Sequence, residues 1–154
     1  MIHYVYTTAR GLCRTVHAEH AHDAWRLAEK KHKPQLLADL TGATWVESTR
    51  GGAIRDLGDI TPEHARNLYF QACLAEIPNA QGVLRSAARD PLPGALVGVV
   101  GGRPAKADAS SRTPRQRVEA SLRLLAARGL YSHIDRDLTD LGRAFAAWIQ
   151  GGCQ

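Results

Sequence analysis

The chain is poor in cysteine and has no long apolar run. Its three cysteines, Cys13, Cys73 and Cys153, are an odd number, lie far apart and form no Cys-x-x-Cys pair. This pattern argues against a disulfide framework and fits a reducing compartment. The longest apolar run, 95–100, has the length of a strand, whereas a membrane-spanning helix needs about 20 residues. We therefore expect no membrane segment.

A secretory signal is absent as well, because residues 1–6 contain no basic segment followed by an apolar core. With 44% hydrophobic and 23% charged residues, the composition is typical of a globular protein rather than a disordered one. The 154 residues suffice for one domain of ordinary size or for two small units that share a core. The sequence thus predicts a soluble, cytoplasmic protein.

Motifs that identify an enzyme are also missing. The chain has no Gly-x-Ser-x-Gly, no His-Glu-x-x-His and no Gly-x-x-x-x-Gly-Lys-Ser/Thr. The glycine-rich segment 94–102 lacks the lysine of a phosphate-binding loop, and 133–137 places one histidine near two aspartates in a turn, where acids are expected as helix caps. We expect a protein that is not an enzyme and that uses no cofactor.

The chain does contain one concentration of positive charge, in the stretch 103–128. The stretch 103–128 has seven basic and two acidic residues, and the other 13 basic residues are balanced by 13 acidic ones, so this stretch accounts for the whole net charge of +5. A basic surface attracts polyanions, and the attraction weakens with salt. The candidate binding residues for nucleic acid or another partner are therefore Arg103, Lys106, Arg112, Arg115, Arg117, Arg123 and Arg128.

The abundance of arginine has a second interpretation. Sixteen of the 20 basic residues are arginine, in a chain rich in alanine and glycine. A GC-rich bacterial genome, or a phage or plasmid adapted to one, tends to encode such a composition. The clustering is therefore more informative than the arginine content, although a helix with both signs of charge can simply be a solvated face.

The N-terminal part predicts a small ββαββ unit over residues 1–58. Strands 2–8 and 12–18 alternate in character around a turn that contains Gly11. A helix over about 21–32 has apolar residues at helical spacing, and Pro34 ends it. We expect a further helical turn over 35–40. A second hairpin follows, with strands 44–49 and 53–57 around Arg50-Gly51-Gly52.

The remainder predicts mainly helices. Thr61-Pro62 opens a helix that Pro78 stops, and its nearly all-apolar character indicates a central place in the core. Thr113-Pro114-Arg115-Gln116 has the pattern of a capping box for a helix to 128, and Asp137 or Thr139 caps a last helix. The expected fold is α+β, with the ββαββ unit packed on a mainly helical part. Its segments are 1–58, a helical pair with a strand over 59–100, a flexible basic linker over 101–112, and a helical hairpin over 113–154.

Two phrases near the C-terminus carry a resemblance. Residues 125–130 read Leu-Ala-Ala-Arg-Gly-Leu, and 138–143 read Leu-Thr-Asp-Leu-Gly-Arg. They resemble the closing part of bacterial winged-helix regulators, in which a recognition helix ends in Leu-x-x-x-Gly-Leu and a wing precedes a Leu-Thr-x-x-Gly-Arg helix. The resemblance implies that 114–128 enters the major groove, with Arg115, Arg117 and Arg123 as contacts.

The resemblance covers about a quarter of the chain, residues 114–144. Two features depart from the family pattern: 131–137 is shorter than a normal two-stranded wing, and the linker 101–112 stands where the first helix of a helix-turn-helix would be. The alternative is an ordinary helical hairpin that closes the core.

A histidine cluster suggests a metal site. His17, His20 and His22 lie at a strand-to-helix junction, and Cys13 or His3 could supply a fourth ligand across the hairpin. Zinc needs three or four converging ligands, but this spacing matches no zinc motif, and His20 stands at the expected helix N-cap. We therefore assign no metal and keep the three histidines as candidates.

Together these observations rank three functions. The first is a non-catalytic bacterial or mobile-element protein that binds nucleic acid, or a nucleoprotein complex, through 103–128. The second is a stoichiometric protein–protein inhibitor or adaptor of phage or plasmid type, similar to anti-CRISPR proteins, whose arginines pair with an acidic host protein. The third is a metal-responsive regulator.

Overall fold

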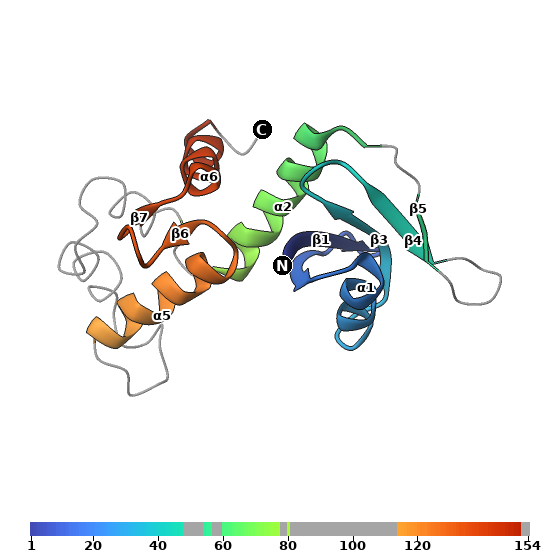
Figure 1. The fold of residues 1–154 in the computed structure, drawn as a ribbon, viewed down its shortest axis with the longest axis horizontal. Coiled ribbons are helices and arrows are strands. Elements are labelled where there is room, and N and C mark those ends of the chain that lie inside the picture. The colour runs from blue at the N-terminus through green and yellow to red at the C-terminus, as the bar shows by residue number, and fades with distance from the viewer. Residues whose placement is uncertain (48–53, 57–59, 78–79, 81–113, 152–154) are drawn as a thin grey trace. The chain divides into compact units, whose positions relative to one another are not determined.

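A computed structural model describes residues 1–47, 54–56, 60–77, 80 and 114–151 (Figure 1). The architecture is α+β, as the sequence predicts, and the chain divides into two compact units, Met1–Glu76 and Ile77–Gln154. The first unit therefore extends beyond residue 58 and includes the helix that follows. The predictions for Pro78, for 81–113, which include the capping Thr113, and for the turn 50–52 lie outside the described residues.

The first unit is built on a five-stranded antiparallel sheet with the strand order β2-β1-β3-β4-β5. Its strands are β1 (Ile2–Thr8), β2 (Cys13–Ala18), β3 (Pro34–Asp39), β4 (Thr44–Glu47) and β5 (Ile54–Asp56). Both expected hairpins, β1–β2 and β4–β5, are formed. At the first turn Gly11 has a φ of 81°, the left-handed conformation that glycine adopts without strain. This confirms the predicted turn at Gly11.

The expectation of a helical turn over 35–40 is wrong. Residues Pro34–Asp39 form β3, which lies between β1 and β4 in the sheet. Leu37 and Ala38 are completely buried there, and they pair with Tyr6 and Val5 of β1. The unit is therefore ββαβββ, with one strand more than expected. Proline is tolerated because it is the first residue of the strand.

Helices cover both faces of this sheet. Helix α1 (Ala21–Glu29) packs on β1, β2 and β3, and its Trp25 joins a buried cluster with Tyr4 and Tyr6. Helix α2 (Pro62–Glu76) packs on β2 and β1, where His3 contacts its Tyr69. Because neighbouring residues of a strand point to opposite faces, the alternation of His3 with Tyr4 and Tyr6 places α1 and α2 on opposite sides.

Helix α2 is fixed at both of its ends. Thr61 is the expected cap, and its Oγ1 accepts a hydrogen bond from His64 N at 3.1 Å. At the other end, Glu76 accepts bonds from Thr15 N at 2.6 Å and from Thr15 Oγ1 at 3.1 Å. Since β2 is an edge strand, its outward-pointing amides have no neighbouring strand to bind, and the Glu76 carboxylate accepts a hydrogen bond from one of them. One flank of α2 stays exposed, including Gln71 and Leu74, so the helix covers the sheet without being enclosed.

The described part of the second unit contains two helices and a short hairpin (Figure 1). The elements are α5 (Pro114–Ala127), β6 (Tyr131–Ser132), β7 (Asp137–Leu138) and α6 (Asp140–Gln150). Their core consists of buried apolar residues: Leu122, Leu125, Leu130, Tyr131, Leu138, Phe145 and Trp148. None of the helices in the described ranges has the length and hydropathy of a membrane span.

Candidate nucleic-acid interface

Helix α5 carries three of the seven candidate basic residues, and a fourth follows it directly. Arg123 is exposed on the helix. Arg128 is half-buried, and its Nη1 donates to Leu124 O at 2.8 Å, so this guanidinium binds a carbonyl of the last helical turn. Arg115 and Arg117 are helical, but their side chains are not among those described. Outside the described residues lie Arg103, Lys106 and Arg112.

The basic positions of α5 do not share one face. At about 100° per residue, positions 115, 119 and 123 form one stripe, in which Glu119 lies between two arginines. Position 117 falls on the other flank of the buried residues Ser121, Leu122 and Leu125. Positions 115 and 123 therefore lie on one flank of α5, and position 117 lies on the other.

A Schellman motif ends α5, and it explains the phrase Leu-x-x-x-Gly-Leu. Gly129 has a φ of 73°, and its N donates to Ala126 O at 3.0 Å. Leu130 N donates to Leu125 O at 2.9 Å, and both leucines are completely buried. These two bonds and the apolar contact are the recurrent helix end that glycine favours. Both leucines and the glycine of the phrase therefore have structural roles.

The segment after α5 forms a minimal β-hairpin. Tyr131 pairs with Leu138, and Ser132 pairs with Asp137. In the turn, Ser132 Oγ accepts from Asp135 N at 3.2 Å, and Arg136 adopts a left-handed φ of 54°. The side chain of Ile134 is 95% exposed. Residues 131–137, short as they are, thus form part of a two-stranded hairpin between two helices.

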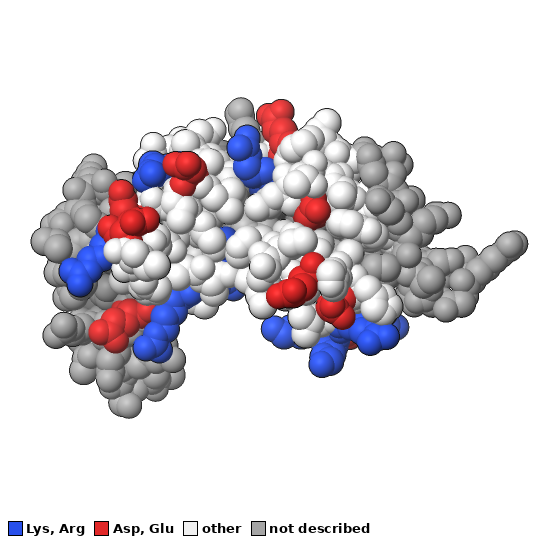
Figure 2. All heavy atoms as spheres, in the orientation of Figure 1, with Lys and Arg blue, Asp and Glu red and all other residues white. Residues whose placement is uncertain are grey.

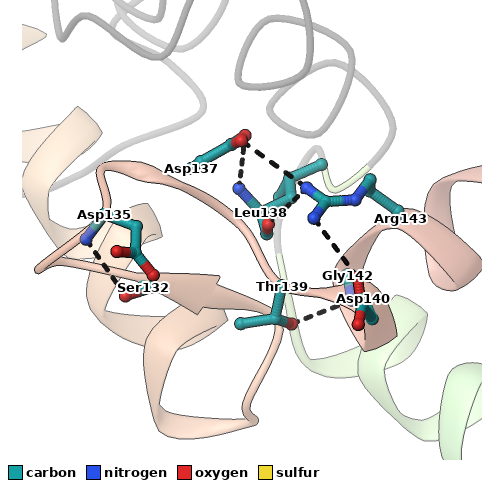
Figure 3. A network of polar contacts seen from close by, with 8 residues as sticks. All are labelled: Ser132, Asp135, Asp137, Leu138, Thr139, Asp140, Gly142 and Arg143. Carbon is teal, nitrogen blue, oxygen red and sulfur yellow. Dashed lines mark hydrogen bonds and ion pairs between the residues drawn. The ribbon is translucent and has the colours of Figure 1, made fainter.

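A polar network fixes the start of α6 (Figure 3). Thr139 is the N-cap, as one of the two expected candidates, and its Oγ1 accepts from Gly142 N at 3.1 Å. Arg143 donates through Nη1 to Leu138 O at 2.7 Å and through Nη2 to Asp140 Oδ1 at 3.3 Å. Its Nη1 also lies 3.5 Å from Asp137 Oδ2. Arg143 is therefore engaged within the unit, although its side chain is 55% exposed.

The two phrases that carry the winged-helix resemblance meet at one junction. Thr139 Oγ1 donates to Gly129 O at 2.5 Å, and Thr139 N donates to Leu130 O at 3.1 Å. Gly142 lies against the same carbonyl, since a Cβ there would be 2.0 Å from Leu130 O. We call this contact of Gly129, Leu130, Thr139 and Gly142 the α5–α6 clasp. It gives the Gly-Leu of the first phrase and the Thr and Gly of the second a structural reason that is independent of any partner.

The division into compact units also divides the charge. Unit Met1–Glu76 has nine basic and nine acidic residues, so its formal net charge is zero. Unit Ile77–Gln154 has 11 basic and six acidic residues, so it carries the whole +5. A long-range attraction for anions therefore originates in the second unit.

The histidine candidates do not converge. His20 is the N-cap of α1 without a side-chain cap bond, and His20 and His22 are exposed. His17 instead faces His3 across the β1–β2 hairpin, with ring centroids 4.5 Å apart. Within the described ranges, no group of three or more histidine, cysteine or acidic side chains is arranged to hold a metal ion.

His3 has an unusual protonation environment. His3 is half-buried, and Tyr69 Oη lies 3.3 Å from its Nδ1. Burial, followed by the nearby His17 and the N-terminal amine, lowers the pKa of His3 from 6.5 to about 4. His3 is therefore neutral near pH 7 and packs as an uncharged ring.

A second group of basic residues lies outside the stretch 103–128. Arg26, Lys30, Lys31 and Lys33 are all exposed at the end of α1 and in the turn that follows. The sequence contains a signal for this group, because three of the four lysines of the chain fall within four residues. The group is not visible in the net charge of the first unit, because nine acidic residues balance the nine basic ones.

Comparisons with known proteins give no family for the chain. It matches no protein-family model, no curated protein and no solved structure. The function is therefore inferred from the residues and their arrangement alone.

Proposed function

We propose that the protein binds nucleic acid, or a nucleoprotein complex, without catalysis, through the basic region 103–128. The observation that carries this proposal is the charge partition between the units, zero for 1–76 and +5 for 77–154. Polyanions such as DNA and RNA bind to a positively charged protein surface through their phosphates, and the release of counterions drives the association.

The geometry around α5 supports a binding role. The α5–α6 clasp joins both ends of the β6–β7 hairpin. The hairpin and α6 therefore form a connected support for α5, the basic helix. The resemblance to winged-helix regulators implies the same order of elements. In this proposal the arginines of one flank of α5 contact phosphates, and the helix approaches base edges when the partner is duplex DNA.

The two flanks of α5 allow a test. Fluorescence anisotropy with a labelled duplex, between about 50 and 300 mM salt, gives affinity and salt slope. Arg115→Glu/Arg123→Glu reverses one flank, and Arg117→Glu reverses the other. We expect one of these variants to lower the affinity by about tenfold or more, with a salt slope smaller by about one for each lost phosphate contact.

Control charges are available in the first unit. Arg10→Glu/Arg66→Glu changes two exposed arginines outside the basic region and should leave binding nearly unchanged. The proposal is overturned if the wild-type chain fails to bind duplex, single-stranded DNA or RNA at low salt, or if the control variant loses as much affinity. Recovery of one acidic host protein from a lysate, together with no affinity for naked nucleic acid, would instead identify the inhibitor or adaptor.

A further inference from the structure

The turn between α1 and β3 is the most cationic described surface of the first unit. Within 26–33 four basic residues accompany one acid, Glu29. Glu29 Oε1 accepts a hydrogen bond from Trp25 Nε1 at 3.0 Å, so this carboxylate is engaged along its own helix. None of the four basic side chains forms an ion pair with another residue in the described part of the chain. In Figure 2 basic side chains gather over the α1 region, with acidic side chains beside them.

The backbone of this turn is held in place. Lys31 N donates to Ala28 O at 3.1 Å, and His32 N donates to the same oxygen at 2.9 Å. Pro34 then begins β3, which pairs with β1 inside the sheet. Positive residues after a helix can serve merely to offset the negative end of its dipole. That role requires no particular orientation of His32.

His32 is oriented by a buried tyrosine. Tyr6 Oη lies 2.7 Å from His32 Nδ1, and Tyr6 is only 2% exposed. Burial raises the pKa of Tyr6, with a further rise caused by Glu76, so the phenol keeps its proton. A buried hydroxyl proton without an acceptor is costly, so Tyr6 donates to Nδ1 of His32, and the ring N–H of His32 lies on Nε2. The turn therefore presents a fixed N–H donor between Lys31 and Lys33.

We propose that Arg26 and the turn 30–33 bind the phosphates of a nucleic-acid backbone. The inference rests on the proposed function for the class of partner, but its residues lie outside 103–128 in the sequence. Each strand of a duplex offers one negative charge per about 3.4 Å of helix axis, so several cations on one short turn can each meet a phosphate. Lysine ammonium groups supply rotatable donors, and His32 Nε2 supplies an oriented one. Such contacts do not distinguish one base sequence from another, so we expect this turn to bind any phosphodiester strand.

The lysines provide the main test. Lys30→Gln/Lys31→Gln/Lys33→Gln removes the charge but keeps the length of each side chain similar. We expect an affinity for labelled duplex and single strand lower by about tenfold near 100 mM salt, and a salt slope smaller by about two to three. The matched control, Arg10→Gln/Arg66→Gln, removes two exposed charges of the same unit and should have a much smaller effect.

Tyr6→Phe tests the positioning role of Tyr6, because the ring remains and only the hydroxyl is lost. Nitrogen-15 NMR of the histidine rings should show the Nε2–H tautomer for His32 in the wild-type chain and a mixture of tautomers in the variant. The variant should also bind nucleic acid more weakly than wild type, with a smaller loss than the lysine variant. A thermal melt of each variant separates this effect from loss of the fold. An Nδ1–H tautomer in the wild-type chain would contradict the oriented donor and overturn the proposal.

Competition identifies the chemistry of the partner. Unlabelled DNA should displace the labelled strand at much lower charge concentration than poly-glutamate, which offers carboxylates. Equal displacement by both polymers would overturn the assignment to phosphate. The arginine and lysine variants also separate the two proposals. If only the variants of α5 lose binding, the turn is not a binding surface and the proposed function remains; if only the lysine variant loses binding, the turn is supported and the role of 103–128 fails.

Discussion

Gly142 and Leu130 approach each other so closely that no side chain fits between them. A Cβ at residue 142 would lie 2.0 Å from Leu130 O and 2.9 Å from Leu130 C. The backbone of α6 therefore contacts Leu130, the last residue of the Schellman motif that ends α5. This contact lets Thr139 donate from N and from Oγ1 to the two adjacent carbonyls, those of Leu130 and Gly129.

Gly142→Ala should consequently destabilise the protein. Because the obstacle is backbone rather than the end of a flexible side chain, we expect a loss of about 3 kcal/mol in the free energy of unfolding. Urea denaturation followed by the fluorescence of Trp148, with the other two tryptophans replaced in the background, reports on this unit. Gly151→Ala is the matched control, since its nearest contact would be an ordinary 3.4 Å to Ala147 O. Equal midpoints for the two variants would contradict the close approach.

Thr139→Ala should lose both the N-cap bond to Gly142 N and the bond to Gly129 O. An N-cap alone contributes about 1 kcal/mol, and the second hydrogen bond contributes a similar amount, so we expect a loss of about 2 kcal/mol. Thr139→Ser keeps the hydroxyl and should restore most of the stability. Chemical denaturation of both variants measures the difference. A serine variant as unstable as the alanine variant would show that the methyl group, and not the hydroxyl, is responsible.

Glu76→Ala should weaken the attachment of α2 to the sheet edge. The carboxylate accepts from Thr15 N and Thr15 Oγ1, and hydrogen bonds to charged groups are worth about 2 kcal/mol. Amide hydrogen exchange should therefore become faster at Thr15 than in the wild-type chain. Gln71→Ala, at an exposed position of the same helix, is the control. Unchanged exchange at Thr15 would argue that water replaces the carboxylate without cost.

His3 makes stability depend on acid. Its folded-state pKa is about 4 and its ordinary value is 6.5, so the unfolded chain binds more protons between these pH values. The contribution of neutral His3 is fully present above pH 6.5 and is lost as the pH falls toward about 4.

Thermal melts as a function of pH, with an NMR titration of the His3 ring, measure this effect. His3→Gln should lose part of the decline in melting temperature below pH 6.5, whereas His22→Gln, at an exposed residue, should retain it. A His3 ring that titrates at 6.5 would refute the neutral packing.

Local signals in the sequence predicted those elements whose ends depend on neighbouring residues. Gly11 marks the first hairpin, Thr61 caps α2, and Thr139 caps α6. Each of these uses bonds between residues a few positions apart, so the pattern is visible in a short window. The helix 21–32 was also expected, although α1 ends earlier, at Glu29.

The candidate site was only partly accessible to the same reasoning. The charge of 103–128 is a property of the sequence, but its distribution over two flanks of α5 depends on helical geometry. His17, His20 and His22 are close in the chain, yet His17 packs against His3 on the opposing strand. The bond from Tyr6 to His32 joins residues 26 positions apart, so no local pattern could reveal it.

Sequence patterns alone were enough to predict the α+β class, the two hairpins of the first unit, the caps of α2 and α6, and the concentration of charge in the second half of the chain. The strand Pro34–Asp39, in contrast, depends on contacts with residues distant in the chain. This segment contains good helix formers, but pairing with β1 and complete burial of Leu37 and Ala38 outweigh that local preference. The same holds for the α5–α6 clasp and for the orientation of His32. Both arise from contacts between distant residues, whose free energies exceed the small differences in backbone propensity.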